Sequence, residues 1–173
     1  TYKKVIDLER NFVDVNFNIA STYVKLSRFD EALPLYEKSL EKDPNNARLH
    51  DYYSRALILA GQPPKEATIY RRKAINLYQA KLRLYPNNTR LHHDIGKNLM
   101  FDAHFDNRPA HSKWDKAERF LLKARQLEPD NSTFQETWQQ FRGFRTQSER
   151  KFSQLNKQTR KISTPRNKKQ NRK

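Results

Sequence analysis

Histidine is the residue type in this sequence best suited to metal or acid–base chemistry. The five histidines are His50, His92, His93, His104 and His111. No two of them have the i, i+4 spacing that places a pair of zinc ligands on one helix face. The chain also has no cysteine, which excludes thiolate ligands. We therefore expect structural or solvated histidines and no metal site.

Residues for catalysis or cofactor binding form no recognisable pattern either. The glycines are Gly61, Gly96 and Gly143, so the chain has no Gly-rich loop that could cradle a phosphate. Serine, histidine and acidic residues occur, but nothing links them into a triad. The sequence predicts no catalytic site and no cofactor, and no small-molecule substrate is expected. The sequence leaves open whether an enzyme domain lies upstream in a longer protein.

The positive charge of the chain is concentrated at its C-terminal end. The net charge is +16, and residues 142–173 account for +11 of it, with twelve Lys or Arg against the single acid Glu149. The basic tail contains Arg160, Lys161, Arg166, Lys168, Lys169, Arg172 and Lys173. Low hydrophobicity with high net charge predicts disorder over residues 161–173. The tail could serve as a solubilising segment, as a nuclear-import or nucleic-acid patch, or as a contact with anionic lipid.

The sequence also contains an internal repeat. The block Pro44–His50, with the sequence PNNARLH, returns as PNNTRLH at Pro86–His92, and a third version opens at Pro129 with PDN. Proline followed by Asn or Asp is typical of a helix end and a fresh start. In the segments before two of these blocks, an alanine is followed by a large residue after four positions and by a small residue after seven, and these offsets share one helix face. The sequence therefore predicts paired helices in series.

Residues 13–46 carry the most complete unit of this series. If residue 13 is counted as position 1, the unit has a small residue at position 8, an aromatic at 11, Ala at 20, an aromatic or Leu at 24, a small residue at 27 and Pro at 32. Those positions are filled here by Ala20, Tyr23, Ala32, Tyr36, Ser39 and Pro44. This unit resembles the tetratricopeptide repeat, a pair of antiparallel helices. The resemblance implies an all-α, antiparallel helix-pair solenoid, with a C-terminal capping helix and a disordered basic tail.

The predicted organisation has six parts. Residues 1–12 are expected to end a preceding repeat, because Tyr2, Val5 and Arg10 match positions 24, 27 and 32; the chain would then be the C-terminal part of a longer array. Residues 13–46 form one repeat, 47–88 a repeat with an extended second helix, and 89–131 a repeat with a long loop within 102–113. Residues 132–160 are predicted to be a capping helix that begins with a Ser132–Gln135 capping box, and residues 161–173 the tail.

The resemblance also implies a binding groove, because first helices line the concave face of such arrays. The residues at groove positions are Phe17, Asn18, Ser21, Lys25, Arg48, Asp51, Tyr52, Arg55, Arg90, His93, Asp94 and Lys97. This aromatic, basic and amide-rich set suits an extended protein or peptide ligand. Chaperone-binding members of the family grip a C-terminal carboxylate with residues at fixed repeat positions. Among the residues at those positions here, Arg90 alone is suitable, so this carboxylate clamp is not expected.

Three functions stay open from the sequence. The first is a protein-interaction scaffold that uses the groove. The second is an accessory segment of a larger enzyme, such as a membrane glycosyltransferase of the O-mannosyltransferase type. The third is association of the tail with nucleic acid or an anionic surface. The compartment is unknown; a cytoplasmic or nuclear location is slightly favoured, and a lumenal one would give meaning to the glycosylation patterns at Asn87 and Asn131.

Overall fold

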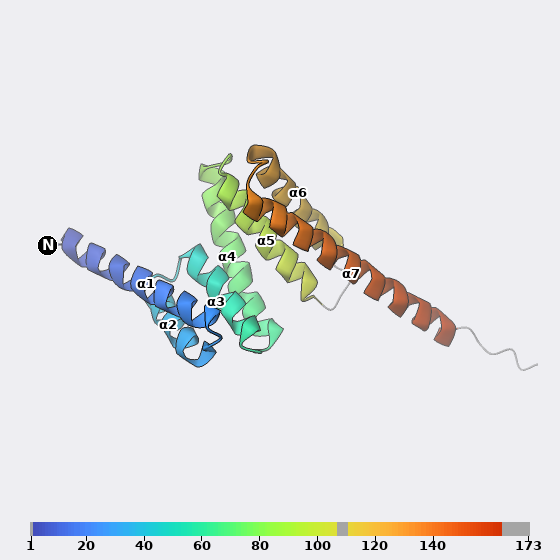
Figure 1. Ribbon diagram of the computed structural model, residues 1–173, viewed down its shortest axis with the longest axis horizontal. Helices are drawn as coiled ribbons and strands as arrows, with labels where there is room; N and C mark the ends of the chain where they lie inside the picture. Colours follow the sequence, from blue (N-terminus) through green and yellow to red (C-terminus); the bar gives the residue numbers. More distant parts are fainter. Residues whose placement is uncertain (1, 107–110, 164–173) are drawn as a thin grey trace, which may run out of the picture.

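The computed structural model describes residues 2–106 and 111–163, with side chains described for 12–106 and 111–159. These residues form seven α-helices and no strand (Figure 1). The helices are α1 (Tyr2–Lys25), α2 (Phe29–Lys42), α3 (Ala47–Leu59), α4 (Pro64–Leu84), α5 (Thr89–His104), α6 (His111–Leu127) and α7 (Ser132–Ser163). The predicted all-α solenoid is confirmed.

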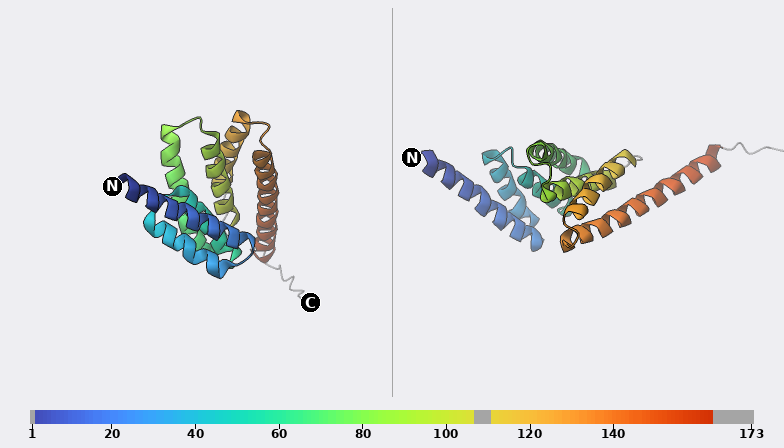
Figure 2. Two further views of the ribbon diagram at one scale, coloured as in Figure 1. Left: turned by 60° about the vertical axis from the view of Figure 1, so that its left-hand side comes forward. Right: turned by 90° about the horizontal axis from the view of Figure 1, so that it is seen from above.

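The helices pack as three successive pairs, α1 with α2, α3 with α4 and α5 with α6. The second helix of each pair packs on the first helix of the next, and α7 closes the stack by packing on both α5 and α6. One apolar cluster lies around Phe17, Tyr36 and Tyr53, and a second lies around Ile95, Trp114 and Phe141. Figure 2 shows that both α1 and α7 reach beyond the helices that cover them.

Small residues permit the close approach of the two helices within each pair. Ala20, Ser54 and Gly96 occupy the same place in α1, α3 and α5, and each is fully buried or nearly so. Gly96 lies so close to α6 that a Cβ atom there would be 2.8 Å from Cγ of Leu121 and 3.0 Å from its backbone nitrogen. The third pair therefore requires a residue without a side chain at this point.

Asparagine caps start α3, α5 and α7 in the same way. The side-chain oxygen of Asn46 accepts hydrogen bonds from the N–H groups of Arg48 and Leu49, and that of Asn88 accepts one from Leu91. Asn131 likewise accepts from the N–H of Phe134 at 3.3 Å. The predicted Ser132–Gln135 capping box is therefore wrong. Asn131 is the cap because it follows the helix-ending proline by two residues, as Asn46 and Asn88 do.

Helix α1 runs without a break from Tyr2 to Lys25. This differs from the prediction that residues 1–12 end a separate preceding repeat. Neither proline nor glycine occurs between Tyr2 and Lys25, so no residue stops the helix near Arg10. The helix ends instead at Lys25, two residues before Ser27, which has a left-handed φ of 58°. Helix α3 likewise ends at Leu59, two residues before Gly61, which has a φ of 74°.

The loop of the third pair is shorter than predicted. Helix α5 continues to His104 and α6 begins at His111, so residues 102–104 and 111–113 of the expected loop are helical. Asp102 is buried and lies 2.9 Å from Lys113 Nζ, which holds the end of α5 against the start of α6. Residues 107–110 lie outside the described residues.

The last helix is longer than predicted, since α7 has 32 residues and ends at Ser163 rather than at residue 160. The backbone of Arg160 and Lys161 is therefore helical, which corrects the start of the predicted disordered segment. The side chains of these two residues lie outside the described residues, as do Arg166, Lys168, Lys169, Arg172 and Lys173. In the described part of the chain, no helix has the length and apolar content needed to cross a membrane.

Candidate peptide-binding groove

The predicted groove residues divide into three groups by exposure. Five are exposed on the first helices of the pairs: Asn18, Lys25, Arg48, Arg55 and Arg90. Three are half-buried: Ser21, Tyr52 and Lys97. Four are buried: Phe17, Asp51, His93 and Asp94. The structure thus keeps Lys25 and the three arginines at the surface, and places Lys97 and both acids among the packed helices.

Two arginines of α3 lie on aromatic rings. The Arg48 guanidinium carbon is 4.2 Å from the centre of the Phe17 ring and 5.7 Å from that of Tyr52. The Arg55 guanidinium carbon is 5.3 Å from the Tyr52 ring centre. Phe17 and Tyr52 in turn meet edge to face, with centroids 4.9 Å apart, so they bridge α1 and α3. Cation–π contacts hold both guanidinium groups in place while their N–H groups stay available to a ligand.

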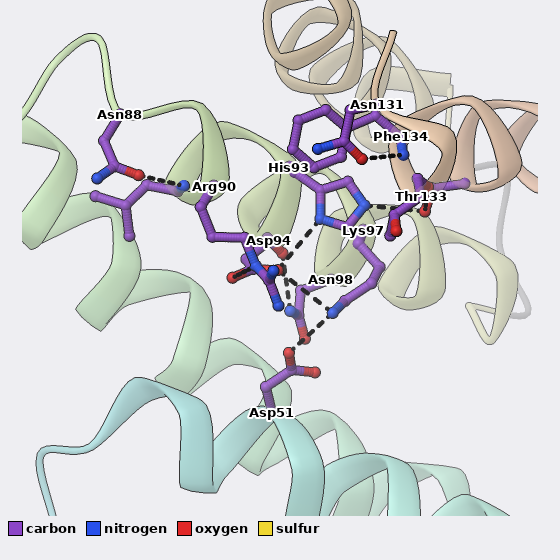
Figure 3. A network of polar contacts seen from close by, with 12 residues as sticks. Asp51, Asn88, Arg90, His93, Asp94, Lys97, Asn98, Asn131, Thr133 and Phe134 are labelled. Carbon is purple, nitrogen blue, oxygen red and sulfur yellow. Dashed lines mark hydrogen bonds and ion pairs between the residues drawn. The ribbon is translucent and has the colours of Figure 1, made fainter. Parts of the chain in front are cut away.

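A network of polar side chains joins the second pair to the third (Figure 3). Lys97 Nζ of α5 lies 3.2 Å from Asp51 Oδ2 of α3 and 3.5 Å from Asp94 Oδ1. Arg90 Nε donates a hydrogen bond to Asp94 Oδ2 at 3.2 Å. Burial alone would raise the pKa of Asp94, but the His93 contact and the charges of Lys97 and Arg90 outweigh it and hold that pKa below its usual value.

His93 extends this network to the last helix. Its Nδ1 lies 3.3 Å from Asp94 Oδ1, its Nε2 lies 2.9 Å from Thr137 Oγ1 of α7, and its ring stacks on Phe134 with centroids 4.6 Å apart. Only 3% of His93 is exposed. Asp51, His93 and Asp94 therefore connect the helices of the stack, which leaves the exposed residues to meet a ligand.

Ser21 also has a structural contact, because its hydroxyl forms a hydrogen bond of 3.0 Å with the Tyr36 hydroxyl of α2. Burial raises the pKa of Tyr36, although this hydrogen bond acts in the opposite direction. The predicted groove residues that remain candidates for ligand contact are Asn18, Lys25, Arg48, Tyr52, Arg55 and Arg90. Asp14 on α1 holds the repeat position that Arg48 holds in α3 and Arg90 in α5, and it is the one exposed acid among these predicted groove positions. The exposed charge of the predicted groove is therefore mainly positive.

Two of the other histidines form part of the turns between pairs. His50 Nε2 lies 2.9 Å from the Pro44 carbonyl oxygen, and His92 Nε2 lies 2.8 Å from that of Pro86. A carbonyl can only accept, so Nε2 carries the proton in both rings. Gln135 makes the same contact with Pro129 at 2.9 Å. Within the described residues, no group of three or more His, Asp or Glu side chains could hold a metal ion.

A buried arginine on α4, Arg71, did not stand out in the sequence. Arg71 is 1% exposed, its guanidinium lies 5.8 Å from the Phe101 ring and 5.5 Å from the Phe105 ring, and its Nε and Nη1 have no hydrogen-bond partner among the described residues. Burial lowers the pKa of Arg71, and the charges of Asp102 and Asp51 partly offset this. A signal existed: Arg71 follows Ala67 by four residues, as the core residue Tyr36 follows Ala32.

Comparison with known proteins supports the repeat pattern. Residues 13–46 match the family model of the tetratricopeptide repeat. Residues 13–46 are therefore a tetratricopeptide repeat. Assignment of residues 47–88 and 89–131 to further repeats of this family stays a prediction, which their equivalent caps, turns and small residues support. A comparison with curated protein sequences finds no match.

Two solved tetratricopeptide structures share the fold over most of the chain. One is the thermophilic protein TTC0263 from Thermus thermophilus, with a TM-score of 0.54 and 14% identity over 82% of this chain and 72% of that one. Another is the first domain of human RPAP3, with a TM-score of 0.51 and 18% identity over 80% of this chain and 96% of that one. At these identities the likeness concerns the fold alone.

Proposed function

We propose that this tetratricopeptide protein is an interaction scaffold that holds an extended, acidic protein segment along α1, α3 and α5. The observation that carries the proposal is the line of exposed cations on the first helices of three successive pairs. Lys25 lies on α1, Arg48 and Arg55 on α3, and Arg90 on α5. Helical solenoids of this kind present extended concave binding surfaces.

The side chains favour carboxylates presented in series. A guanidinium group donates two parallel hydrogen bonds to a carboxylate, and the aromatic contacts of Arg48 and Arg55 reduce the conformational entropy lost on binding. Tyr52 is half-buried between these two arginines and offers an aromatic face to an apolar ligand residue. The groove therefore suits a segment in which acidic residues flank a leucine or an aromatic.

The experiment measures fluorescence polarisation with two labelled peptides of about 12 residues, roughly 40 Å when extended. One contains Glu, Leu and Ser, and the other has Lys in place of each Glu. We expect the full chain to prefer the acidic peptide, and the triple variant Arg48→Ala, Arg55→Ala, Arg90→Ala to lose about tenfold or more in affinity.

A matched control removes one exposed arginine elsewhere. Arg83 lies on α4, a second helix, and is exposed. Arg83→Ala should bind the acidic peptide as the unchanged chain does, while Arg55→Ala alone should weaken binding. Equal affinity of the triple variant and the unchanged chain, with helicity retained in both, would show that the groove is not the binding surface.

A further inference from the structure

The outer side of α1 is an apolar stripe that no described helix covers. Phe12, Val15, Ile19 and Leu26 are exposed by 44%, 54%, 42% and 61%. Their spacings of three, four and seven residues place them on one side of the helix. Val5 and Leu8 continue the same spacing in the sequence of α1. The three–four alternation over residues 5–19 is the heptad spacing of helices that pair along a seam.

In the equivalent helices of the repeat, the residues that correspond to this stripe are buried. The residues equivalent to Val15 and Ile19 are Leu49 and Tyr53 in α3, and Leu91 and Ile95 in α5; all four are 5% exposed or less. Tyr53 is covered by the preceding second helix, because its hydroxyl donates to Glu37 Oε1 at 2.6 Å and its ring lies 6.1 Å from Tyr36. A helix laid against α1 would bury Val15 and Ile19 in the same way.

We infer that the helix that covers this stripe is α1 of a second copy, so that two chains pair through their α1 helices. Among the described side chains, the other exposed large hydrophobic residues are isolated or form the pair Leu84–Tyr85 at a helix end. A second copy therefore offers one surface that matches the stripe in length and spacing, its own α1. A two-fold contact of this type is self-complementary.

The surroundings of the stripe permit this contact in a strongly basic chain. In the described part of α1, the neutral Asn16 and Asn18 border the stripe, whereas the charged Asp14 and Lys25 lie more than about 100° around the helix from its centre. Figure 2 shows the N-terminal end of α1 projecting beyond the neighbouring helices. The groove cations Lys25 and Arg48 lie away from the stripe, and Asn18 is the groove residue of α1 that borders it.

Sedimentation equilibrium of the full chain tests the pairing. Between about 1 and about 300 µM, the weight-average mass should rise from the 20.7 kDa of one chain towards twice that value. Val15→Glu should hold the mass at one chain, since it places a charge in the seam. Ile69→Glu is the matched control, because Ile69 is 63% exposed on α4 and lies away from the stripe; this variant should dimerise normally.

Two results would overturn the inference: a single-chain mass at every concentration, or a dimer that Val15→Glu leaves intact. Circular dichroism of each variant reports whether the chain is folded. If Val15→Glu were unfolded, Phe12→Glu provides a second test, because Phe12 lies one turn nearer the free end of α1 and is 44% exposed. This measurement does not depend on peptide binding, so failure of the pairing inference is distinguishable from failure of the proposed groove.

Discussion

Lys97 holds one carboxylate from its own helix and one from the preceding pair. Its Nζ lies 3.5 Å from Asp94 and 3.2 Å from Asp51, and only 14% of its side chain is exposed. A partly buried amine between two acids contributes more than an exposed ion pair, because little water screens it. These three residues therefore fix how α5 sits on α3, and with it the spacing between Arg48 and Arg90.

We expect Asp94→Asn to destabilise the chain by about 2 kcal/mol at pH 7, because it leaves the buried network with an unbalanced charge. The folded-state pKa of Asp94 is lowered, so its stabilisation is complete above the unfolded pKa of about 3.9 and is lost as pH falls through the folded pKa. Urea unfolding should therefore show the variant and the unchanged chain converging below about pH 4.

Asp14→Asn is the control for this prediction, since Asp14 is exposed at a groove position of α1. That change should alter the free energy of unfolding by less than about 0.5 kcal/mol. Equal losses in the two variants, or a constant difference at every pH, would contradict the role assigned to Asp94.

The sequence could not separate predicted groove residues that stay exposed from those that hold the helices together. Repeat positions place Asp51, His93 and Asp94 with Arg48 and Arg90, but the contact between His93 and Thr137 joins residues 44 apart in the chain. Such a partner depends on how helices stack, which local periodicity does not reveal. Arg71 was predictable in part, because its place in the repeat is that of a buried side chain.

The paired helices depend on a small residue at one point of contact. Ala20, Ser54 and Gly96 fill this place, and the distance to Leu121 leaves no room for a Cβ atom at Gly96. Gly143 of α7 differs, because a Cβ atom there would meet nothing within 4 Å. The two helical glycines thus allow the same substitution to be compared in a crowded and an open position.

Gly96→Ala should destabilise the chain by about 1–2 kcal/mol, because the overpacking of α5 against α6 exceeds the gain of about 1 kcal/mol in helix propensity. Gly143→Ala should stabilise it by up to about 1 kcal/mol, since only propensity changes. Thermal unfolding followed by circular dichroism measures both. The packing of the third pair would be wrong if the two variants shifted the midpoint in the same direction.

Helix ends were predicted well where proline and asparagine mark them, and poorly elsewhere. The proline turns at residues 44, 86 and 129 separate the pairs as expected. The boundary near Arg10 was inferred from weak positional matches, and α1 passes through it because nothing there interrupts helical hydrogen bonding. The loop after α5 was predicted within 102–113 from Pro109 and the polar residues there, but the contact of Asp102 with Lys113 lets this polar residue pack inside the stack.

The whole molecule presents two surfaces with different chemistry. The groove side of α1, α3 and α5 has exposed cations over an aromatic base, and the outer side of α1 has an uncovered apolar stripe. The sequence predicted the first surface through the repeat pattern. It did not predict the second, because the residues of the stripe had been divided between two expected units, and only the continuous helix brings them into one line.

Reversal of the groove charge tests the central claim most directly. The triple variant Arg48→Glu, Arg55→Glu, Arg90→Glu keeps the three positions and changes only the sign of their charge. If the groove selects acidic segments, the unchanged chain should bind the Glu-containing peptide more tightly, and the variant should prefer the Lys-containing one, each by about tenfold or more at moderate salt. A folded variant that kept the preference of the unchanged chain would contradict the account.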